Sequence, residues 1–452
     1  MKGFILAKFF GTDGVRGLAN TGKMTPSSML RLGQVVGRYF SSQSSGRASA
    51  VIGKDTRMSG DMIEAALIAG LTSVGVDIKC AGVIPTSGVS LMTKGLRADV
   101  GVMITASHNK YLDNGVKLFG PDGCKLSDQA EADIEALLVT SEEAGVPSAE
   151  LGRVSTPDGL QARYIELCKS TLPDGHTLSG LKIVIDAAHG AAFDTAAATL
   201  WELGADEVMS IGDAPTGDNI NAGCGSTATE LLSKTVIETG ANVGVALDGD
   251  ADRLIMCDET GKVIDGDQLL GLIATSWKAQ GRLRGNGLVA TVMSNLGLER
   301  YLAANDLNLI RTQVGDRHVA AKMRADGYNV GGEQSGHLLM TEYSPTGDGT
   351  MAAIQILAEI KRQGRPASDV LNVFKPVPQI LKNVRYSGEN PMPNPKLLSA
   401  IDAGQSDFAG QGRILIRASG TEPLIRVMAE GDDSQKVEAI VDSFVELIGS
   451  LT

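Results

Sequence analysis

The chain has 452 residues, too many for one hydrophobic core, and we expect three or four domains. Hydrophobic residues make up 43% and charged residues 21% of it, as in folded globular proteins rather than disordered ones. A net charge of −12 without a long basic stripe argues against nucleic-acid binding. The lack of an apolar run of about 18 residues argues against a membrane protein.

Strand-like apolar runs alternate with helix-like segments, the pattern of α/β domains. We predict strands at 50–53, 76–83, 100–104, 181–186, 243–247, 288–292, 380–386, 413–417 and 424–429. Helices are expected at 62–74, 191–203, 296–304 and, with an apolar face, near the C-terminus. A polar stretch at 140–157 is predicted to be a surface connection. The predicted domains are residues 1–155, 156–256, 257–370 and 371–452.

Five cysteines are scattered along the chain and form no C-x-x-C pair. This indicates neither a disulfide framework nor a zinc site, and it is typical of a reducing compartment. The first ten residues are too short for a signal peptide. We therefore expect a cytoplasmic protein.

Three aspartates alternate with other residues in Asp248-Gly249-Asp250-Ala251-Asp252-Arg253. Clustered carboxylates are costly without a cation, and a hard ion such as Mg²⁺ prefers oxygen ligands. An EF-hand is excluded because Arg253 stands where that loop needs glycine, and because strand-like runs flank the segment. A solvated acidic turn is the other alternative. We predict a metal site formed by Asp248, Asp250 and Asp252.

Ser107 follows a predicted buried strand in Thr105-Ala106-Ser107-His108-Asn109. Adjacent residues usually point in different directions, so a Ser107–His108 nucleophile–base pair is not expected, and there is no G-x-S-x-G elbow. A loop with local hydrogen bonds is the ordinary explanation of such a segment. Beside an acidic metal loop, however, a serine at the end of a strand can carry a phosphoryl group.

The segment Arg417-Ala418-Ser419-Gly420-Thr421-Glu422-Pro423 joins two predicted strands. A guanidinium, two hydroxyls and a glycine within five residues can hold a phosphate through charge-assisted hydrogen bonds and exposed backbone N–H groups. A plain hairpin turn would not need this combination. We predict phosphate binding by Arg417, Ser419, Gly420 and Thr421, with Arg426 as a weaker helper.

Two further segments are ambiguous by themselves. In 331–337, Glu333 and Ser335 lie two residues apart between glycines, which suits sugar hydroxyls as well as it suits a glycine-rich turn. The segment 11–17, with Arg16, and Lys117 also remain open. A lone arginine or lysine is usually a solvated surface charge.

Together these segments resemble the motifs of the α-D-phosphohexomutase superfamily, in the same order and along almost the whole chain. The motifs are GTDGVRG at 11–17, TASHN at 105–109, DGDADR at 248–253, GEQSGH at 332–337 and RASGTEP at 417–423. The first and last motifs are similar to the branch that acts on an aminosugar phosphate. The phosphomannomutase/phosphoglucomutase branch is the alternative. It more often has Met in place of Gln334 and Asn-Thr in place of Gly420-Thr421, so these positions favour the aminosugar branch.

The resemblance implies an α/β fold of three similar mixed αβ domains and a smaller C-terminal α+β lid domain around a central cleft. It assigns the phosphoserine loop to the first domain and the metal loop to the second. The sugar-binding loop belongs to the third domain and the phosphate-binding loop to the fourth.

The resemblance also implies phosphoryl transfer between O6 and O1 of the sugar. Phosphorylated Ser107 gives its phosphoryl group to the free hydroxyl, a glucosamine 1,6-bisphosphate turns over in the cleft, and Ser107 takes back the other phosphate. The implied catalytic residues are Ser107, Arg16, Lys117, His108 and His337. The implied ligands of one Mg²⁺ are Ser107, Asp248, Asp250 and Asp252. The implied substrate-binding residues are Arg253, Glu333, Ser335, Arg417, Ser419, Gly420, Thr421 and Arg426.

Which of Lys117, His337 and His108 moves the proton stays open. The expected partners are a small sugar phosphate and, for the first loading of Ser107, an activating kinase or autophosphorylation, with the chain a monomer or homodimer. A catalytically inactive sugar-phosphate-binding protein on the same fold is a further alternative. The intact Ser107 and the three aspartates argue against it.

Overall fold

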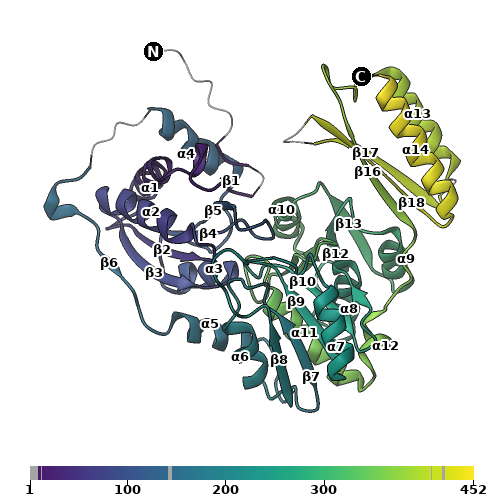
Figure 1. Cartoon of the computed structure of the whole chain (residues 1–452), viewed down its shortest axis with the longest axis horizontal. Coiled ribbons are helices and arrows are strands. Elements are labelled where there is room, and N and C mark those ends of the chain that lie inside the picture. The colour runs from purple at the N-terminus through teal and green to yellow at the C-terminus, as the bar shows by residue number, and fades with distance from the viewer. Residues whose placement is uncertain (1–8, 12, 141–144, 409, 420–422, 452) are drawn as a thin grey trace.

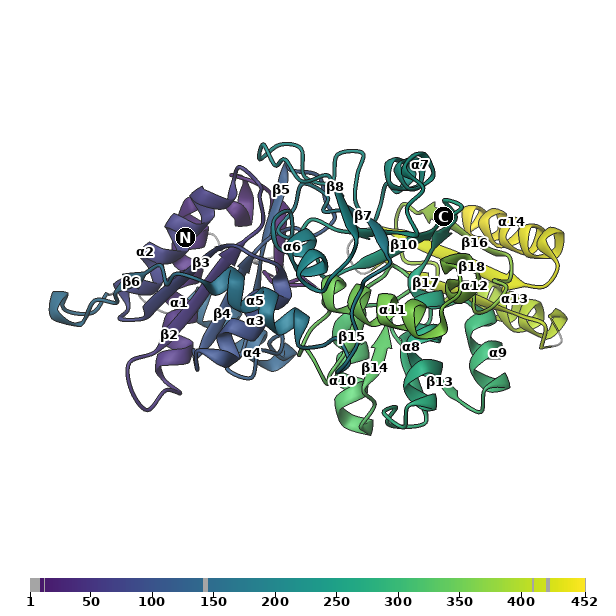
Figure 2. The same ribbon diagram turned by 90° about the horizontal axis from the view of Figure 1, so that it is seen from below.

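The computed structural model describes residues 9–11, 13–140, 145–408, 410–419 and 423–451. Four sheets follow one another along the chain, each with helices packed against it (Figure 1). Figure 2 shows the first domain and the C-terminal domain at opposite ends, with the second and third between them. This confirms the expected four-domain α/β architecture.

The first domain has a six-stranded sheet in the order β1-β5-β4-β2-β3-β6. Its strands are β1 (Val15–Leu18), β2 (Ser49–Lys54), β3 (Asp77–Val83), β4 (Val100–Ile104), β5 (Asp113–Phe119) and β6 (Val154–Ser155). Its helices are α1 (Pro26–Ser41), α2 (Gly60–Ser73), α3 (Thr86–Gly95) and α4 (Asp128–Thr140), with 3-10 turns at Gly22–Met24 and Ser148–Glu150. Strand β6, which lies in the stretch 140–157 predicted to be a surface connection, is exposed and pairs with β3.

The second domain has a five-stranded sheet in the order β11-β10-β9-β7-β8. Its elements are α5 (Leu160–Lys169), β7 (Lys182–Asp186), α6 (Thr195–Glu202), β8 (Glu207–Ile211), α7 (Glu230–Thr239), β9 (Val243–Leu247), β10 (Leu254–Asp258) and β11 (Val263–Ile264). A boundary after residue 256 would cut β10. We therefore place it after Ile264, where this sheet ends.

The third domain has a four-stranded sheet in the order β13-β12-β14-β15. Its strands are β12 (Gly287–Thr291), β13 (Asn308–Thr312), β14 (Val330–Gly332) and β15 (Leu338–Met340). Its helices are α8 (Gly266–Ala279), α9 (Leu296–Ala304), α10 (Asp316–Asp326), α11 (Gly349–Gln363) and α12 (Ala367–Leu371).

The C-terminal domain is an antiparallel sheet in the order β16-β18-β17, with two helices packed against it (Figure 1). Its elements are β16 (Gln379–Arg385), α13 (Pro395–Asp407), β17 (Gly412–Ala418), β18 (Leu424–Gly431) and α14 (Ser434–Ser450). Among all the helices in the described ranges, none has the length and apolar composition needed to cross a membrane.

The hydrophobic cores divide the molecule differently from the sheets. One continuous core includes Val51 of the first domain, Leu247 of the second and Leu357 of the third. The C-terminal domain has its own core around Val427 and Phe444. The first three domains are therefore packed as one body, and the fourth buries its apolar face internally.

Parallel strands in the first three domains direct the polar loops to one region. Strands β4, β9 and β12 are each buried at all five positions. The loops with Ser107, Asp248 and Glu333 follow the carboxyl ends of β4, β9 and β14. Ligand sites of open α/β sheets lie outside these ends, so the topology predicts a shared site there.

Candidate active site

Ser107 lies in the turn after β4, where its backbone is left-handed with φ 51°. This conformation is uncommon for residues other than glycine, and neighbours must hold it. The side chain is buried and points at the second domain, with Oγ 2.6 Å from Asp248 Oδ2. His108 Nδ1 lies 3.3 Å from Ser107 Oγ, so the expectation that the side chains of Ser107 and His108 point in different directions was wrong.

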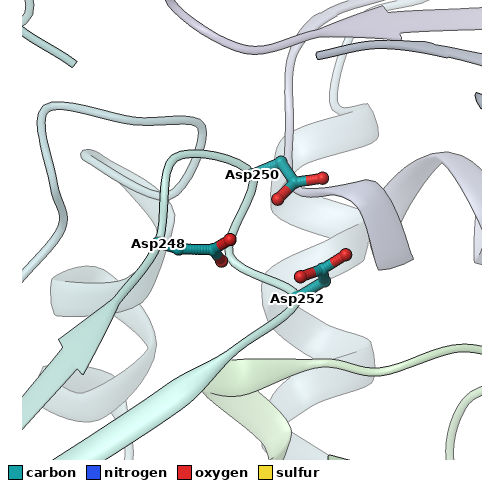
Figure 3. Close-up of side chains that lie close together, drawn as sticks. All are labelled: Asp248, Asp250 and Asp252. Carbon is teal, nitrogen blue, oxygen red and sulfur yellow. The ribbon is translucent and has the colours of Figure 1, made fainter. Parts of the chain in front are cut away.

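The three aspartates of the predicted metal loop point toward one another (Figure 3). One oxygen of each lies within 4.8 Å of the others, and all three side chains are buried. Within the described residues, Asp250 Oδ1 has no hydrogen-bond partner. Such a set of hard, buried oxygens fits a divalent cation such as Mg²⁺.

Gly249 allows this loop to approach the serine loop. A Cβ at position 249 would lie 2.6 Å from the Ser107 carbonyl oxygen, which is closer than real Cβ contacts. The backbone of the metal loop and that of the serine loop are thus in direct contact. A glycine is needed here for close approach and not for a left-handed turn.

The charges of the three carboxylates are unequally compensated. Burial raises the pKa of Asp248 to about 8, and repulsion from Asp252 and Asp250 adds to the shift. Lys117 Nζ lies 2.7 Å from Asp250 and 2.8 Å from Asp252. Burial opposes ionisation of Asp252 as well, but Lys117 and then His337 hold its pKa well below the ordinary value. A cation would therefore stabilise the Asp248 side most, which is the side facing Ser107.

His337 lies between two carboxylates. Its Nδ1 is 3.4 Å from Asp252 Oδ1 and its Nε2 is 3.3 Å from Asp316 Oδ2. Burial works against its charge, but Asp252 and Asp316 outweigh burial and raise its pKa to about 9. Lys117 behaves alike, since Asp13 and Asp250 outweigh burial and raise its pKa well above the ordinary value. Both groups therefore carry a proton at neutral pH.

His108 has the opposite charge state. Burial lowers its pKa to about 4, and the nearby guanidinium groups of Arg253 and Arg16 contribute to the shift. The ring is therefore neutral at pH 7. It is an uncharged neighbour of the Ser107 hydroxyl.

A ring of alternating charges joins the first three domains. Lys125 Nζ lies 2.5 Å from both Asp13 and Asp316, and so links the first domain to the third. Asp13 also lies 3.5 Å from Lys117 and contacts Arg16. In order around the ring, the groups are Asp13, Lys125, Asp316, His337, Asp252 and Lys117.

A cavity of about 220 Å³ opens beside Ser107. It is lined by Asp13, Lys125, residues 314–316 and seven residues predicted from the sequence, which are Arg16, Ser107, His108, Asp252, Arg253, Glu333 and His337. Lys117 is buried and does not line it. The cavity therefore combines a serine, an acidic loop and several cations from three domains.

The predicted sugar loop reaches this cavity through Glu333. The Gly315 N–H donates to Glu333 Oε1 at 3.0 Å, which orients the carboxylate. Ser335 is exposed, and its Oγ lies 3.3 Å from Glu333 Oε2. Ser335 is not among the residues that line the cavity.

The predicted phosphate loop places two arginines face to face. Arg417 on β17 and Arg426 on β18 are direct cross-strand partners. Like charges in this arrangement are destabilising. Burial and then Arg426 lower the pKa of Arg417, whose Nε is buried and has no hydrogen-bond partner in the described part of the chain. An anion bound between the two guanidinium groups would relieve this repulsion.

Ser419, in the same loop, does not line the cavity beside Ser107. Ser419 is half-buried at the end of β17, and Gly420 and Thr421 fall outside the described residues. All residues that line the cavity beside Ser107 come from the first three domains. The structure thus brings together the serine, metal and sugar loops, with the arginine pair on a separate domain.

Sequence reasoning missed several groups at the site. Asp13 could have been found from the sequence, because it lies in the segment 11–17 that was singled out as a possible site segment. Lys125, Asp316 and Thr86 could not be found in this way, since each is one polar residue among many. Thr86 Oγ1 lies 2.5 Å from Asp250 Oδ2 and so fixes one arm of the acidic loop.

The sequence matches all four domains of the phosphoglucomutase/phosphomannomutase family. The alpha/beta/alpha domains I, II and III match residues 7–145, 162–261 and 265–377, and the C-terminal domain matches residues 381–447. The order and extent of these matches agree with the four sheets.

Curated relatives are similar along nearly the whole chain. A phosphoglucosamine mutase of Agrobacterium fabrum (strain C58 / ATCC 33970) is 56% identical over 444 residues, which are 98% of each chain. One of Sphingopyxis alaskensis (strain DSM 13593 / LMG 18877 / RB2256) is 54% identical over 443 residues, covering 98% of this chain and 99% of the relative.

Solved structures share the fold at low sequence identity. A phosphoglucomutase/phosphomannomutase family protein of Burkholderia thailandensis has a TM-score of 0.81 at 22% identity, covering 99% of this chain and 98% of that one. An N-acetylphosphoglucosamine mutase of Aspergillus fumigatus has a TM-score of 0.62 at 19% identity, covering 90% and 83%. The domain matches and the curated relatives show that the chain belongs to the phosphoglucomutase/phosphomannomutase family, in its phosphoglucosamine mutase group.

Proposed function

We propose that this isomerase interconverts glucosamine 6-phosphate and glucosamine 1-phosphate through a phosphoserine at Ser107, a step toward UDP-N-acetylglucosamine. One observation carries the proposal: the Ser107 hydroxyl lies 2.6 Å from Asp248 in a buried cluster of three carboxylates. A serine of a hydrolase would need a base and an oxyanion hole instead. This serine faces an acidic loop that can hold a cation, and phosphoryl transfer uses a cation for charge compensation.

Phosphoryl transfer needs alignment and charge compensation more than covalent assistance. In the first half, the bond from phosphorus to the Ser107 oxygen breaks as a bond forms to the free sugar hydroxyl. The 1,6-bisphosphate then turns around, and Ser107 accepts the other phosphoryl group. Arg16, on the cavity wall, steadies the charge of the phosphoserine.

Asp248, Asp250 and Asp252, with an oxygen of the phosphorylated Ser107, would hold one Mg²⁺. Bound there, the ion compensates the charge of the phosphoryl group during transfer. The Aspergillus fumigatus mutase of similar fold is described in complex with GlcNAc-6P and magnesium. The partly uncompensated charge at Asp248 supports the same assignment here.

A proton must move from the sugar hydroxyl to the Ser107 oxygen in the first half, and back in the second. Lys117 and His337 are protonated groups that contact the acidic loop. We assign this relay to one of them, which gives its proton to the Ser107 oxygen as the phosphorus–oxygen bond breaks and receives the proton of the sugar hydroxyl. His108 is neutral and contacts Ser107 Oγ, which makes it a hydrogen-bond partner of the serine.

Substrate binding is divided between two loops. Glu333, with Ser335 beside it, would hold sugar hydroxyls, and Arg253 lines the same cavity. Arg417 and Arg426 would hold the phosphate that does not react, together with Ser419, Gly420 and Thr421. Because the two loops bind groups common to both substrate orientations, one site can serve both halves of the reaction.

The test is direct. The chain with Mg²⁺ is incubated with glucosamine 6-phosphate, and the 1-phosphate formed is measured in parallel with glucose 6-phosphate and mannose 6-phosphate. Preference for glucosamine 6-phosphate supports the proposal. Preference for either other sugar assigns the phosphomannomutase/phosphoglucomutase branch, and no turnover of any of them indicates a binding protein.

The free cysteines of the described chain support a cytoplasmic location.

A further inference from the structure

Four backbone carbonyls of the serine loop converge on one buried side chain, Arg57, which follows β2. Nη1 lies 2.5 Å from the carbonyl oxygen of Lys110 and 3.1 Å from that of Asp113. Nη2 lies 2.8 Å from the carbonyl oxygens of both Ser107 and Asn109. A guanidinium carries five donors in a rigid fork. One side chain therefore donates to all four carbonyl oxygens.

Asp55 completes the same arrangement. It pairs with Arg57 Nε at 2.9 Å, and neither side chain is exposed. Asp55 also accepts a hydrogen bond from the Thr105 hydroxyl at 2.7 Å, and Thr105 Oγ1 accepts the Ser107 N–H at 2.8 Å. Ser107 is thus held by its carbonyl through Arg57 and by its N–H through Thr105.

Asn221 reaches the serine loop from the second domain. Its Nδ2 lies 2.9 Å from the Ser107 carbonyl oxygen and 3.0 Å from that of Asn109, the two oxygens that also accept from Arg57 Nη2. A Cβ at Gly249 would lie 2.8 Å from this Nδ2. The metal loop is therefore packed against the same contact.

We propose that Arg57 and Asn221 are positioning residues for phosphoryl transfer, which hold Ser107 in its left-handed conformation with Oγ directed at Asp248. The inference rests on the proposed function, because it concerns the serine that carries the phosphate. Neither residue lines the cavity beside Ser107, so they act through the backbone of the loop. They hold that backbone from two different domains.

A positioning role has a kinetic signature that a merely structural role lacks. A displacement of about 1 Å can lower the rate of an aligned reaction about 100-fold. The sugar and the non-reacting phosphate contact other loops, so substrate affinity does not depend on this alignment. The expected signature is a lower kcat at unchanged KM, measured well below the thermal midpoint of each variant, so that the loss of rate does not come from loss of folded protein.

Asn221 provides the cleaner test, because its φ of 56° is left-handed and glycine accepts this conformation. Asn221→Gly removes both hydrogen bonds and should lower kcat about tenfold. Asn221→Asp keeps the shape but turns a carboxylate toward two carbonyl oxygens, and should lower kcat about 100-fold.

Arg57→Lys keeps the charge and loses the fork, so it cannot reach all four carbonyls, and kcat should fall about 100-fold. Combined with Asn221→Gly, the two losses should be less than multiplicative, because both side chains act on the same oxygens. If Arg57→Lys fails to fold, the two Asn221 variants decide the matter. Asn286→Gly is the matched control, since Asn286 is also left-handed (φ 52°) and is exposed at the start of β12.

The measurements are steady-state kcat and KM, the thermal midpoint, and single-turnover transfer from phosphorylated Ser107 to glucosamine 6-phosphate. The proposal is supported by slow transfer in the Asn221 variants at wild-type KM, at a temperature where each variant is fully folded, with Asn286→Gly unchanged. It is overturned by wild-type transfer rates in the Asn221 variants. It is also overturned if the transfer rate falls only in proportion to a lower thermal midpoint or a higher KM. A wild-type chain without phosphate on Ser107 and without mutase activity overturns the proposed function itself, and is recognised before any variant is made.

Discussion

The molecule has two regions that suit phosphate, and they are held in opposite ways. Around Ser107, three domains share one hydrophobic core, and their charged groups compensate one another in a closed ring. In the C-terminal domain, Arg417 and Arg426 face each other on a sheet with a core of its own. Under the proposed function, the first region is preorganised for the phosphoryl group in transfer. Within the described residues, Arg417 Nε of the second region has no hydrogen-bond partner, and we propose that this region binds the anion that arrives with the substrate.

The joint between the two regions is polar. Arg413 Nη2 donates to the carbonyl oxygens of Val292 and Ser294 at 2.7 and 2.8 Å. Asn295 Nδ2 donates to the carbonyl oxygen of Val377 at 3.0 Å. Interfaces of this kind allow domains to move relative to one another more readily than a shared apolar core does. We therefore expect chemistry to depend on the first region and substrate affinity on the second.

Removing the serine should have the largest effect. Ser107→Ala should lower turnover more than about 1000-fold and should abolish the added mass of one phosphate, because no other group can carry it. Intact-mass analysis and a coupled assay check both results. Ser335→Ala serves as a control, since Ser335 is exposed and should not affect phosphate content. An active Ala variant with wild-type phosphate content would contradict the mechanism.

Removal of the metal should have the second-largest effect. Exhaustive chelation should abolish activity and Mg²⁺ should restore it, because Asp248, Asp250 and Asp252 offer only hard oxygen ligands. Zn²⁺ should support turnover poorly. Undiminished activity in the chelated protein, confirmed metal-free by elemental analysis, would reject the metal role.

The Lys125–Asp316 bridge tests whether the first region is one unit. The pair is partly buried, and breaking it from one side leaves an uncompensated charge, which in a fully buried pair costs roughly 3–5 kcal/mol and less here. Lys125→Met should therefore lower both the thermal midpoint and kcat, and adding Asp316→Asn should recover part of the loss.

A double-mutant cycle measures this coupling. The exposed Lys322–Asp326 pair (2.8 Å) is its control and should show almost no coupling. Additive losses for Lys125 and Asp316 would mean that the bridge does not join the domains energetically.

Arg417→Ala tests the second region by itself. Losing a charge-assisted hydrogen bond costs about 1.5–3 kcal/mol, or roughly tenfold to over a hundredfold in affinity. KM should rise, and kcat should fall if closure of the fourth domain depends on the contact. Phosphate on Ser107 should be unchanged, since that serine belongs to the first domain. Wild-type KM and kcat, matching those of the exposed control Arg365→Ala, would show that the loop is only a hairpin turn.

The smallest effect concerns the joint. Asp267 accepts the Asn295 N–H at 2.7 Å, and burial, with repulsion from Asp265, raises its pKa to about 7. Because the pKa of this carboxyl is higher in the folded than in the unfolded state, the free energy of unfolding of the protein falls as pH rises from about 4 to about 7. Asp267→Asn should remove this loss. Its thermal midpoint should exceed that of wild type by a few degrees at pH 8 and by less at pH 5. A constant difference at both values would rule out titration of Asp267.

Much of the site was predictable because local patterns reflect local chemistry. Alternating aspartates after a strand predicted a carboxylate cluster that could hold a metal, and the structure brings these three carboxylates together. A serine after a buried strand, beside such a loop, led to the proposal that Ser107 carries the phosphoryl group. The fold class followed from the alternation of strand and helix patterns. The boundary near residue 256 was misplaced because β10 and β11 read equally well as the start of a new unit. Their pairing with β9 depends on long-range hydrogen bonds.

By itself, the sequence predicted the residue types of the proposed chemistry: the serine, the three aspartates, Glu333 and the arginine loop. Only the tertiary structure decided what surrounds them. Lys125 and Asp316 are 191 positions apart, and Asn221 is 114 from Ser107, yet each pair is in contact. Such contacts carry no local signal, because burial and charge compensation depend on which strand ends converge in space.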